Sequence, residues 1–557
     1  MKKLIALLLA VAMVFCLAAC GGEKTPTTSK APAQETTDPK NEASNPSAAG
    51  EGDKTNAEGA VRDGAYVPSD ETLYVACKGN PTGVFFLTVT AVSFNNPTLS
   101  SMYDRLVRFD YDTNSVVPML ATDWEYVDDT HVRMHLRDDV VSHAGDPFTA
   151  SDVIYTLKTG QESGMLSNYY SMFNLDECKV EDDYTVIIAT NNVEPYLLFN
   201  LSNTPLSMVV EASVEKSGGL DAQSKFPNAC TGPYKFVEWS DGSYIKLERN
   251  EEYWDEPAYY KDVEIRIVTD ASARVMNLES GDVDIALDPD SNQLATLVGN
   301  DKFQVINAPT ANITTMYLNC TKAPFDDVNV RRAVALAINY EANLQIGAGG
   351  YGTITDSFLP QRNGAYVSAV DGGYETNFRY DVEAAKAALA ESAYPDGFEF
   401  TLIYAENAIF NSYGELIQNQ LGQLGITVKL ESMASSVFYE RTSAGDFDAQ
   451  IVNSSNPDPA IQLRYFDKRI DFKTMRGGSG FVQGSDELLQ LMDEAKVTLD
   501  PATSKEIYTK IQAIIADECP AVPLYSPTKT CAADSDIKNI NVCYFGDINW
   551  SRAYRVN

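Results

Sequence analysis

The sequence Cys230-Thr231-Gly232-Pro233-Tyr234-Lys235-Phe236-Val237-Glu238-Trp239 continues through Ser243-Tyr244-Ile245-Lys246-Leu247-Glu248-Arg249-Asn250 to Tyr253-Trp254. A Gly-Pro turn opens it, and apolar and polar residues then alternate in two runs. The dipeptide Asp241-Gly242 lies between these runs. Alternation with a period of two, interrupted by Asp-Gly, predicts a β-hairpin.

Other motifs precede and follow the hairpin. Before it are Ser101-Met102-Tyr103-Asp104-Arg105-Leu106 and Pro147-Phe148-Thr149-Ala150-Ser151-Asp152, and after it are Leu278-Glu279-Ser280-Gly281-Asp282 and Pro324-Phe325-Asp326-Asp327. Thr149 with Asp152 predicts a helix start that points Val153 and Leu157 inward. A strand over 263–268, a helix from Asp270 and a short strand near 283–285 predict an α/β unit.

The hairpin and these motifs, spread over roughly residues 70–530, resemble the extracytoplasmic solute-binding proteins of peptide and nickel ABC importers, family 5. The resemblance implies an α/β, two-lobed periplasmic-binding-protein-like fold of type II, in the large class with an extra subdomain in the first lobe. It implies a receptor that closes on a small-molecule or peptide solute and delivers it to ABC permease subunits. We therefore expect a monomeric binding protein without a cofactor, and not an enzyme.

Length and charge agree with this expectation. A chain of 557 residues exceeds what one core supports, and 44% hydrophobic residues suffice for several cores. The net charge of −35 would repel a phosphate backbone, so we expect no nucleic-acid partner. Solubility alone explains most of these charges.

The N-terminus predicts export and lipidation. Lys2 and Lys3 precede an apolar run over 4–15 that is too short for a permanent membrane span. Leu17-Ala18-Ala19-Cys20-Gly21 resembles a bacterial lipobox, which implies a signal peptide over 1–19 and a lipid on Cys20; an ordinary signal peptidase site is the alternative. Residues 20–65 contain almost no large apolar residue and predict a disordered tether. We expect an extracytoplasmic lipoprotein anchored to the cell membrane.

The folded part is expected to divide into lobes along the chain. Residues 66–310 would form lobe I, with an inserted subdomain over about 100–228. Residues 311–522 would form lobe II, and residues 523–557 would return to lobe I.

The region 397–459 suggests where the solute binds. Strands are predicted over 398–404, 426–430 and 447–452, and Ser412 with Glu415 predicts the start of the first intervening helix, which would stop at Gly425. In an open α/β sheet, ligands bind beyond the carboxyl ends of the strands, so the loops 405–411 and 453–459 should border one crevice. The resemblance adds positions near the hairpin and near 317–319. The candidate ligand-binding residues are Asn80, Thr231, Gly232, Tyr317, Asn319, Tyr404, Glu406, Phe410, Asn411, Asn453, Ser454, Ser455, Asn456 and Asp458.

One position departs from the family. Many peptide-binding members have an Asp that pairs with the α-ammonium of the peptide, and this chain has Ser455 there, with Val452 at a position usually held by Trp. A neutral hydroxyl cannot make the charge-assisted bond that a buried ammonium requires. Asp458 and Glu406 are the candidates to replace it. Oligopeptides, dipeptides, nickel chelates, opines and oligosaccharides all remain as solutes.

Other types of site find less support in the sequence. His131, His135 and His143 are the three histidines, but His131 and His135 stand about 13 Å apart along a strand, too far for one metal ion. Seven cysteines beyond residue 20 lack the CxxC spacing of zinc sites, and the odd number leaves at least one free thiol. A secreted hydrolase is disfavoured because no GxSxG, HExxH or Walker A motif is present. The sequence does not distinguish a transporter subunit from a sensory lipoprotein of the same fold.

Overall fold

The computed structural model of the chain describes residues 67–85, 87, 96–110, 113, 115–163, 166–361, 363, 365–455, 458–467, 469–470, 486–542 and 548–556. The chain divides into two compact units, 1–44 and 45–557, and all described residues belong to the second. The predicted signal peptide, Cys20, the tether and Asn456 lie outside the described residues. Within the described part, no helix combines the length and apolar character needed to cross a bilayer.

The predicted hairpin is confirmed. Its strands are β8 (Tyr234–Ser240) and β9 (Tyr244–Arg249), and Gly242 between them has a φ of 70°, which glycine adopts without strain. β9 pairs antiparallel with β10 (Asp262–Ile267), and β1 (Thr72–Cys77) runs parallel to both β10 and β11 (Ile285–Leu287). The helix α7 (Ala271–Ser280) connects β10 to β11, as the sequence predicted for this α/β unit.

A second group of strands is built around a βαβ unit. β15 (Glu399–Ala405) and β16 (Thr427–Met433) are parallel and are connected by α13 (Ala408–Gly422). β17 (Ala449–Ser455) is parallel to β15, follows α14 (Ser435–Ser443) in the chain and pairs antiparallel with β13 (Asn312–Leu318). The predicted α/β character of this region is confirmed.

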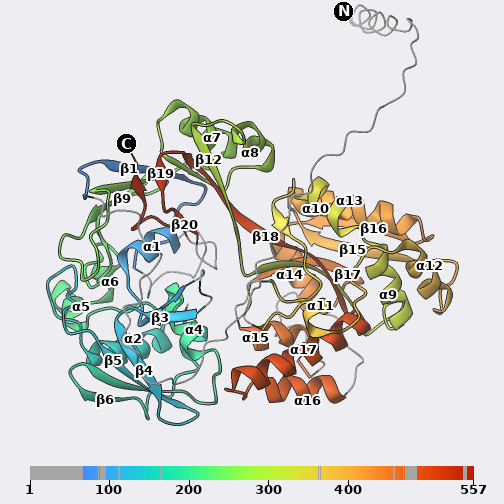
Figure 1. Cartoon of the computed structure of the whole chain (residues 1–557), viewed down its shortest axis with the longest axis horizontal. Helices are drawn as coiled ribbons and strands as arrows, with labels where there is room; N and C mark the ends of the chain where they lie inside the picture. Colours follow the sequence, from blue (N-terminus) through green and yellow to red (C-terminus); the bar gives the residue numbers. More distant parts are fainter. Residues whose placement is uncertain are drawn as a thin grey trace, which may run out of the picture. The chain divides into compact units, whose positions relative to one another are not determined.

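The long strand β18 (Ala521–Asp534) joins the two groups into one sheet (Figure 1). Residues 521–525 of β18 pair with β13, and residues 531–533 pair with β11. Its other partners are β14 (Gly352–Thr353) and β12 (Phe303–Pro309). The strand order is β16-β15-β17-β13-β18-β11-β1-β10-β9-β8. Within β18 the chain therefore passes from the second group of strands to the first.

A separate antiparallel sheet lies within residues 121–189. Its order is β4 (Ala121–Tyr126), β5 (His131–Leu136), β7 (Thr185–Ala189) and β6 (Lys179–Asp182). The helix α2 (Ala150–Glu162) starts with the predicted capping box of Thr149 and Asp152, and Val153 and Leu157 are fully buried. The remaining short strands are β2 (Val107–Asp110), β3 (Ser115–Pro118), β19 (Ile537–Lys538), β20 (Asn541–Val542), β21 (Ile548–Asn549) and β22 (Tyr554–Arg555).

The remaining helices cover these sheets. They are α1 (Asn96–Met102), α3 (Ser167–Tyr170), α4 (Leu197–Leu201), α5 (Glu211–Ser217), α6 (Leu220–Gln223), α8 (Ser291–Leu297), α9 (Val328–Ala337), α10 (Tyr340–Gly347), α11 (Ala369–Gly372), α12 (Val382–Ala390), α15 (Pro459–Leu463), α16 (Asp486–Ala495) and α17 (Pro501–Glu518). One large apolar core is formed by residues between Leu73 and Leu287 together with residues between Cys531 and Ala553. Two others lie between Met316 and Tyr525. The apolar residues are thus buried in separate cores at either end of β18.

Several boundaries differ from the sequence prediction, and those at the two predicted loops matter most. Helix α13 begins at Ala408, because Asn407 caps it by accepting hydrogen bonds from the amides of Ile409 and Phe410. Ser412 therefore lies inside the helix, where its hydroxyl bonds to the carbonyl of Ala408 at 3.1 Å. The helix also ends at Gly422 instead of continuing to Gly425, and strand β17 extends to Ser455 instead of ending at residue 452.

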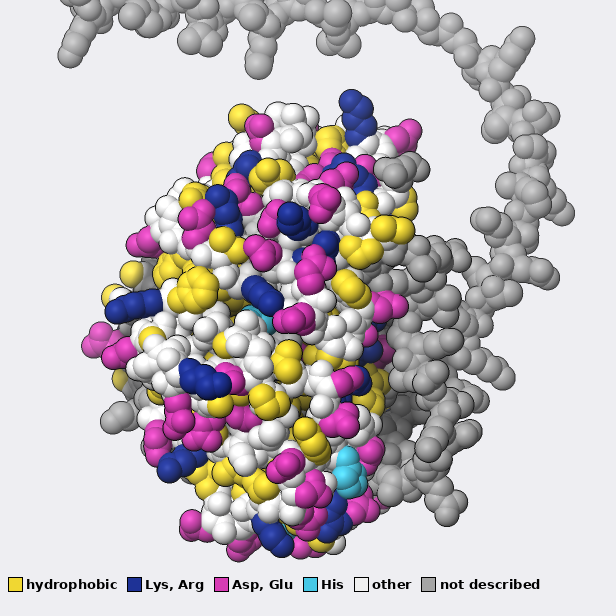
Figure 2. Space-filling model, turned by 90° about the vertical axis from the view of Figure 1, so that its left-hand side faces the viewer, with side chains coloured by type: hydrophobic (Ala, Val, Ile, Leu, Met, Phe, Trp, Pro, Cys, Tyr) yellow, Lys and Arg dark blue, Asp and Glu magenta, His cyan; other side chains and the backbone are white. Residues whose placement is uncertain are grey.

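Charge is spread over the surface. Figure 2 shows acidic side chains on one face interspersed with Lys and Arg, as expected when acidity serves solubility. Each strand histidine has an acidic neighbour: His131 contacts Asp128 at 2.9 Å, and His135 contacts Asp123 at 2.5 Å. The described cysteines 77, 178, 230, 320, 519 and 531 are free thiols.

Candidate functional site

The signature residues of the hairpin surround a buried carboxylate. Asp104 is fully buried and accepts hydrogen bonds from the Thr231 hydroxyl at 3.0 Å, the Trp254 indole N–H at 2.9 Å and the Tyr253 hydroxyl at 3.2 Å. Burial raises the pKa of Asp104, although these donors favour its charged form. Thr231, predicted to face the ligand, uses its hydroxyl in this internal network.

Gly232 is fixed by backbone packing. Its N–H bonds to the carbonyl of Met102 at 2.9 Å, and a Cβ at this position would lie 2.5 Å from the Met102 carbonyl carbon. The Gly232 carbonyl accepts hydrogen bonds from His143 Nε2 at 2.9 Å and from the Asn250 amide at 3.2 Å. The predicted site residues Thr231 and Gly232 thus connect segments of the fold.

Asn80 caps the hairpin turn. Its side-chain N–H donates to Asp241 at 2.6 Å, and its side-chain oxygen accepts from the amide of Gly242 at 3.1 Å. Asn80 is exposed, but the nitrogen and the oxygen of its side-chain amide both bond to the turn between β8 and β9.

Three predicted residues near β13 and β15 are buried in cores. Asn319 holds a turn by donating to the carbonyl of Phe447 at 2.9 Å. Tyr404 packs in a core beside α13, so closely that a Cβ added to Gly414 would lie 3.0 Å from the Tyr404 hydroxyl. Tyr317 is also fully buried and packs against Tyr465 and Phe466, with ring centroids 5.5 and 6.2 Å away. Its hydroxyl has no hydrogen-bond partner among the described residues.

The first predicted loop is partly helical. Phe410 and Asn411, placed in a loop by the sequence prediction, lie in the first turn of α13. Phe410 packs against the core, and Glu406 before the helix is exposed. The prediction of a loop over 405–411 is therefore wrong beyond residue 407.

The second predicted loop is mostly strand. Asn453, Ser454 and Ser455 are the last residues of β17, where Ser455 pairs with Asn312. Asn453 is exposed, and Ser454 is buried and accepts a hydrogen bond from Gln462 at 2.8 Å. Asp458 caps α15 by accepting from the amide of Ala460 at 2.8 Å. Asp458 also lines a cavity, the only residue of the predicted set to line either of the two described cavities.

This cavity, which we call the Glu194 cavity, has a volume of about 320 Å³. One wall comes from the segment that leads from β7 into α4, and the other from α15 and the end of α16. The lining residues are Asn192, Val193, Glu194, Pro195, Tyr196, Asp458, Ala460, Asp493, Ala495, Lys496 and Val497. Two segments that lie far apart in the sequence, 192–196 and 458–497, thus meet at one cavity.

Electrostatics single out Glu194. Burial, and then the neighbouring charge of Asp458, raise the pKa of Glu194 to about 7. Asp493 is balanced, because it accepts hydrogen bonds from Arg469 at 2.7 and 2.8 Å and lies 3.6 Å from the Lys496 ammonium. Glu194 is therefore the carboxylate of this cavity whose charged form is disfavoured.

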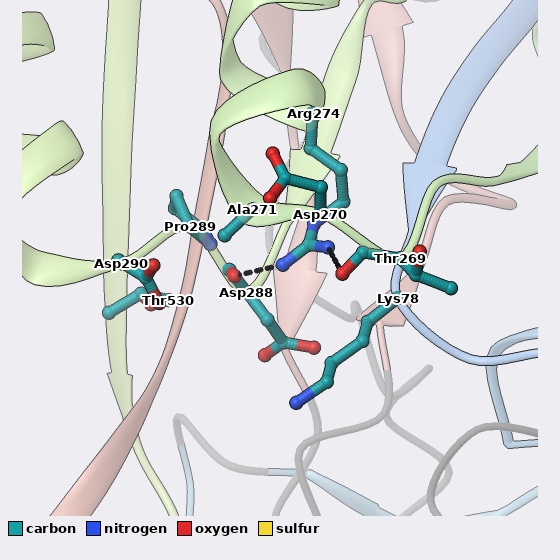
Figure 3. A pocket seen from close by; sticks show the side chains of 9 residues that line it. All are labelled: Lys78, Thr269, Asp270, Ala271, Arg274, Asp288, Pro289, Asp290 and Thr530. Carbon is teal, nitrogen blue, oxygen red and sulfur yellow. Dashed lines mark hydrogen bonds between the residues drawn. The ribbon is translucent and has the colours of Figure 1, made fainter. Parts of the chain in front are cut away.

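A second cavity of about 410 Å³, the Lys78 cavity, lies beyond the carboxyl ends of β1, β10 and β11 (Figure 3). Arg274 is buried there, and its guanidinium donates to the carbonyls of Leu287, Thr269 and Asp288. The lining residues are Lys78, Thr269, Asp270, Ala271, Arg274, Asp288, Pro289, Asp290 and Thr530. This is the edge of a parallel sheet at which ligands bind in α/β folds.

Two carboxylates of the Lys78 cavity already have partners within the fold. Asp288 has a positive φ of 49° and pairs with Lys529 at 2.7 Å, and Asp270 caps α7. Lys78 and the candidate residue Asn80 both lie in the loop that follows β1. Lys78 lines this cavity, whereas the side chain of Asn80 bonds to the turn between β8 and β9.

Sequence reasoning missed Glu194 and Lys496. Neither residue lies in a recognisable motif. Each lines the Glu194 cavity only because segments that are distant in sequence meet there. The one available signal was the missing Asp at position 455, which indicated that another carboxylate must be sought. Among the described residues, no group of three or more His, Cys, Asp or Glu side chains is arranged to hold a metal ion.

Comparison with known proteins identifies the family. Residues 115–470 match the model of the bacterial extracellular solute-binding proteins, family 5 Middle. The chain is 25% identical to heme-binding protein A of Haemophilus influenzae over 82% of its length and 87% of the relative's. It is 27% identical to a probable D,D-dipeptide-binding periplasmic protein of Escherichia coli over 78% of its length and 85% of the relative's.

A solved structure shares the fold. The structure of an ABC transporter-associated periplasmic binding protein from Helicobacter pylori, in complex with the peptide STSA, superposes with a TM-score of 0.68 at 24% identity. The match covers 86% of this chain and 98% of that one. The chain therefore belongs to family 5 of the bacterial extracellular solute-binding proteins, and it has their type II periplasmic-binding-protein fold.

Proposed function

We propose that this chain is the solute receptor of an ABC importer and that its solutes are di- or oligopeptides. The observation that carries the proposal is the match of residues 115–470 to a family of solute-binding proteins. Peptides are favoured because the relative from Escherichia coli is named for D,D-dipeptides and the structure from Helicobacter pylori contains a peptide. Heme is the competing solute, because the relative from Haemophilus influenzae is named for it.

The mechanism of such a receptor is binding coupled to closure. A ligand shifts a conformational equilibrium only by its difference in affinity for the two states, so a solute that favours closure must contact both sides of the cleft. The Glu194 cavity supports this mechanism, since its walls come from the segment at 192–196 and from α15 and α16. Binding here would hold those segments together, and a permease would recognise the closed form. This role needs binding alone, without a catalytic step.

The domain division proposed from the sequence fits this mechanism. Lobe I would comprise residues 66–310 with the inserted subdomain over about 100–228, lobe II residues 311–522, and residues 523–557 would return to lobe I. Its support is the pairing of β18 with β13 at one end and with β11 at the other. The solute would then lie between the lobes, with Asp458 as the predicted residue that lines its cavity.

The location follows from the N-terminus. We propose that residues 1–19 are removed, that Cys20 carries the lipid, and that residues 20–65 tether a monomer to the outer face of the cell membrane. Two acyl chains hold a protein at a membrane far better than one. The tether would let the receptor reach its permease without leaving the membrane.

A ligand screen tests the proposal. The mature chain, purified in detergent, is examined by native mass spectrometry for co-purified solute and by thermal unfolding with di- to tetrapeptides, hemin and a nickel chelate. Because a ligand that binds only the folded state stabilises it, peptides are expected to raise the melting temperature. A rise with hemin or the nickel chelate, and none with any peptide, would refute the peptide assignment.

A further inference from the structure

The strands β12, β13 and β18 form one antiparallel ribbon that connects the two groups of strands. Its first ladder, between β12 and β18, ends where Pro309 pairs with Thr528. Its second ladder, between β13 and β18, begins where Thr314 pairs with Tyr525. In this described stretch no ladder pair joins the residues in between, so the ribbon is interrupted between its two ladders.

The interruption is also short of backbone donors. It consists of residues 310–313 and 526–527, which we call the crossing. Pro527 lies within the crossing and Pro309 directly before it, and proline has no N–H to donate to a ladder. A buried backbone carbonyl still needs a hydrogen-bond donor. The carbonyls of the crossing therefore depend on donors other than the N–H groups of a ladder.

Two buried hydroxyls supply these donors. Thr310 and Ser526 have only 3% and 2% of their surface exposed. The Thr310 hydroxyl donates to the carbonyl of Pro527 at 2.7 Å and accepts from the amide of Asn312 at 3.2 Å. The Ser526 hydroxyl donates to the carbonyl of Asn312 at 2.6 Å. Each strand thus gives one side-chain bond to the backbone of the other, and these two bonds join the strands where the ladder does not.

Strand β18 is anchored on either side of the crossing. In the proposed lobe II, Ser526 pairs with Thr353 of β14. In the proposed lobe I, Lys529 forms an ion pair with Asp288 at 2.7 Å, and the carbonyl of Thr530 accepts from the amide of Asp288 at 3.2 Å. Hinges are a few residues that absorb a change of backbone dihedral angles. A rotation between the lobes therefore falls on the short stretch between these anchors and on the strand opposite.

We propose that Thr310 and Ser526 are the positioning residues of the hinge on which the two lobes close. Their hydroxyls hold the strands of the crossing together while the backbone between the anchors changes its dihedral angles. The proposal rests on the function proposed above, because it names the residues about which closure takes place. A crossing held in this way leaves fewer orientations of the lobes open, so less conformational entropy is lost when a solute closes them.

A purely structural role of these hydroxyls predicts a different result. Loss of a buried hydrogen bond lowers stability anywhere in the chain. Thr156 in α2 is the matched case for a threonine, because its hydroxyl donates to the carbonyl of Asp152 at 2.7 Å and accepts from the amide of Val209 at 3.2 Å. Ser207 is the matched serine, whose buried hydroxyl donates to the carbonyl of Thr204 at 2.7 Å. Both belong to the proposed inserted subdomain, so their loss should lower stability without changing the orientation of the lobes.

The test measures the distance between the lobes and needs no solute. Spin labels are attached to non-natural amino acids that replace Met276 on α7 and Ile346 on α10, which are exposed positions in the two proposed lobes. The free thiols of the chain are left unlabelled in this way. Double electron–electron resonance then records the distribution of label distances in the mature chain in detergent.

Matched variants carry the comparison. The hinge variants are Thr310→Val and Ser526→Ala, and their controls are Thr156→Val and Ser207→Ala. Thr310→Ser keeps a hydroxyl at the crossing and should behave as the unmodified protein does. Thermal unfolding without ligand verifies that each variant is folded. Ser526→Ala is the smaller change, and it decides the test if Thr310→Val does not fold.

The expected result without ligand is a broader distance distribution in the hinge variants than in the controls, because the crossing then permits more orientations of the lobes. Tri-alanine should bind the hinge variants about 3- to 10-fold more weakly than the controls, since closure then removes more conformational freedom. Distributions as narrow in the hinge variants as in the controls would overturn the proposal. A Thr310→Ser distribution as broad as that of Thr310→Val would overturn it too.

The outcomes separate this proposal from the proposed function. If the hinge variants broaden the distribution and tri-alanine changes no distance in the unmodified protein, the hinge assignment stands and tri-alanine fails as a solute. If tri-alanine shortens the distance in the unmodified protein and the hinge variants resemble the controls, the receptor function stands and the hinge assignment is overturned.

Discussion

The hydroxyl of Thr231 donates a hydrogen bond of 3.0 Å to the buried carboxylate of Asp104. Two motifs of the chain that stand out in the sequence, one around residue 104 and one at the hairpin, are thereby bound to each other. Tyr253 and Trp254, at the end of the hairpin motif, complete the set of donors. These motif residues therefore form an internal structural element of the fold.

Asp104→Ala should destabilise the protein strongly. The substitution leaves the Thr231 hydroxyl and the Trp254 N–H without their acceptor, and each unsatisfied buried donor costs about 1–3 kcal/mol. We expect a loss of about 3 kcal/mol in the free energy of unfolding, measured by urea denaturation. Asp129→Ala, an exposed aspartate in a turn, is the control and should change it little. A small effect at Asp104 would contradict the structural role of this network.

Substitution of two glycines by alanine should change the free energy of unfolding in opposite directions. Gly232→Ala would place its Cβ 2.5 Å from a backbone carbon of Met102, which cannot move aside, so about 2–3 kcal/mol should be lost. Gly422, the last residue of α13, has open space around a Cβ. Gly422→Ala should stabilise the protein by about 0.5–1 kcal/mol because alanine favours the helix. Chemical denaturation measures both, and a stable Gly232→Ala variant would contradict the close contact.

His143 should make the protein sensitive to acid. Burial lowers its pKa from 6.5 to about 4, and its Nε2 must carry a proton because it donates to the Gly232 carbonyl. Cys230 Sγ lies 3.2 Å from Nδ1, and Lys235 disfavours a positive charge. Since the unfolded chain binds a proton at higher pH than the folded one, stability falls as the pH drops from about 6.5 to about 4.

The His143→Gln variant checks this relation. Its amide can still donate to the Gly232 carbonyl but does not titrate, so about 2 kcal/mol of the acid-induced loss should disappear between pH 7 and pH 4. His135→Gln, at the partly exposed histidine on β5 that contacts Asp123, is the control. Identical pH profiles for the His143 variant and the unmodified protein would refute this prediction.

The contribution of Glu194 to stability should depend on pH in the opposite direction to that of His143. Its pKa is raised to about 7, so the folded state holds a proton that the unfolded chain releases near pH 4.5. Stability due to this group is therefore greatest below about pH 4.5 and is lost as the pH rises toward 7. Without ligand, Glu194→Gln should raise the melting temperature at pH 8 by about 1–2 °C and change it less at pH 5. Equal shifts at both pH values would contradict the raised pKa.

The fold was largely predictable because its signals are local. The Asp241-Gly242 turn, the capping box at Thr149 and the alternation in β8 and β9 each depend on neighbouring residues. Errors arose where two local signals competed. Both Asn407 and Ser412 can cap a helix, and only the structure shows that Asn407 accepts the amides of the first turn.

The candidate site was less predictable because it depends on distant contacts. Asp458 was foreseen from its place after a strand of an α/β unit, but Glu194 reaches the same cavity from the segment after β7. A prediction from one sequence cannot place such a pair, since no spacing relates them. Thr231 and Asn319 show the converse, because the motifs that contain them suggested ligand contacts and the structure gives them internal hydrogen bonds.

The central claim is that a solute is held between the segment at 192–196 and the helix α15. Hydrogen–deuterium exchange of the mature chain, with and without the tightest-binding member of the peptide panel, tests it most directly. The predicted result is slower exchange in both regions at once when the peptide is bound. Slower exchange in only one of them, or in neither while the peptide remains bound, would contradict the account.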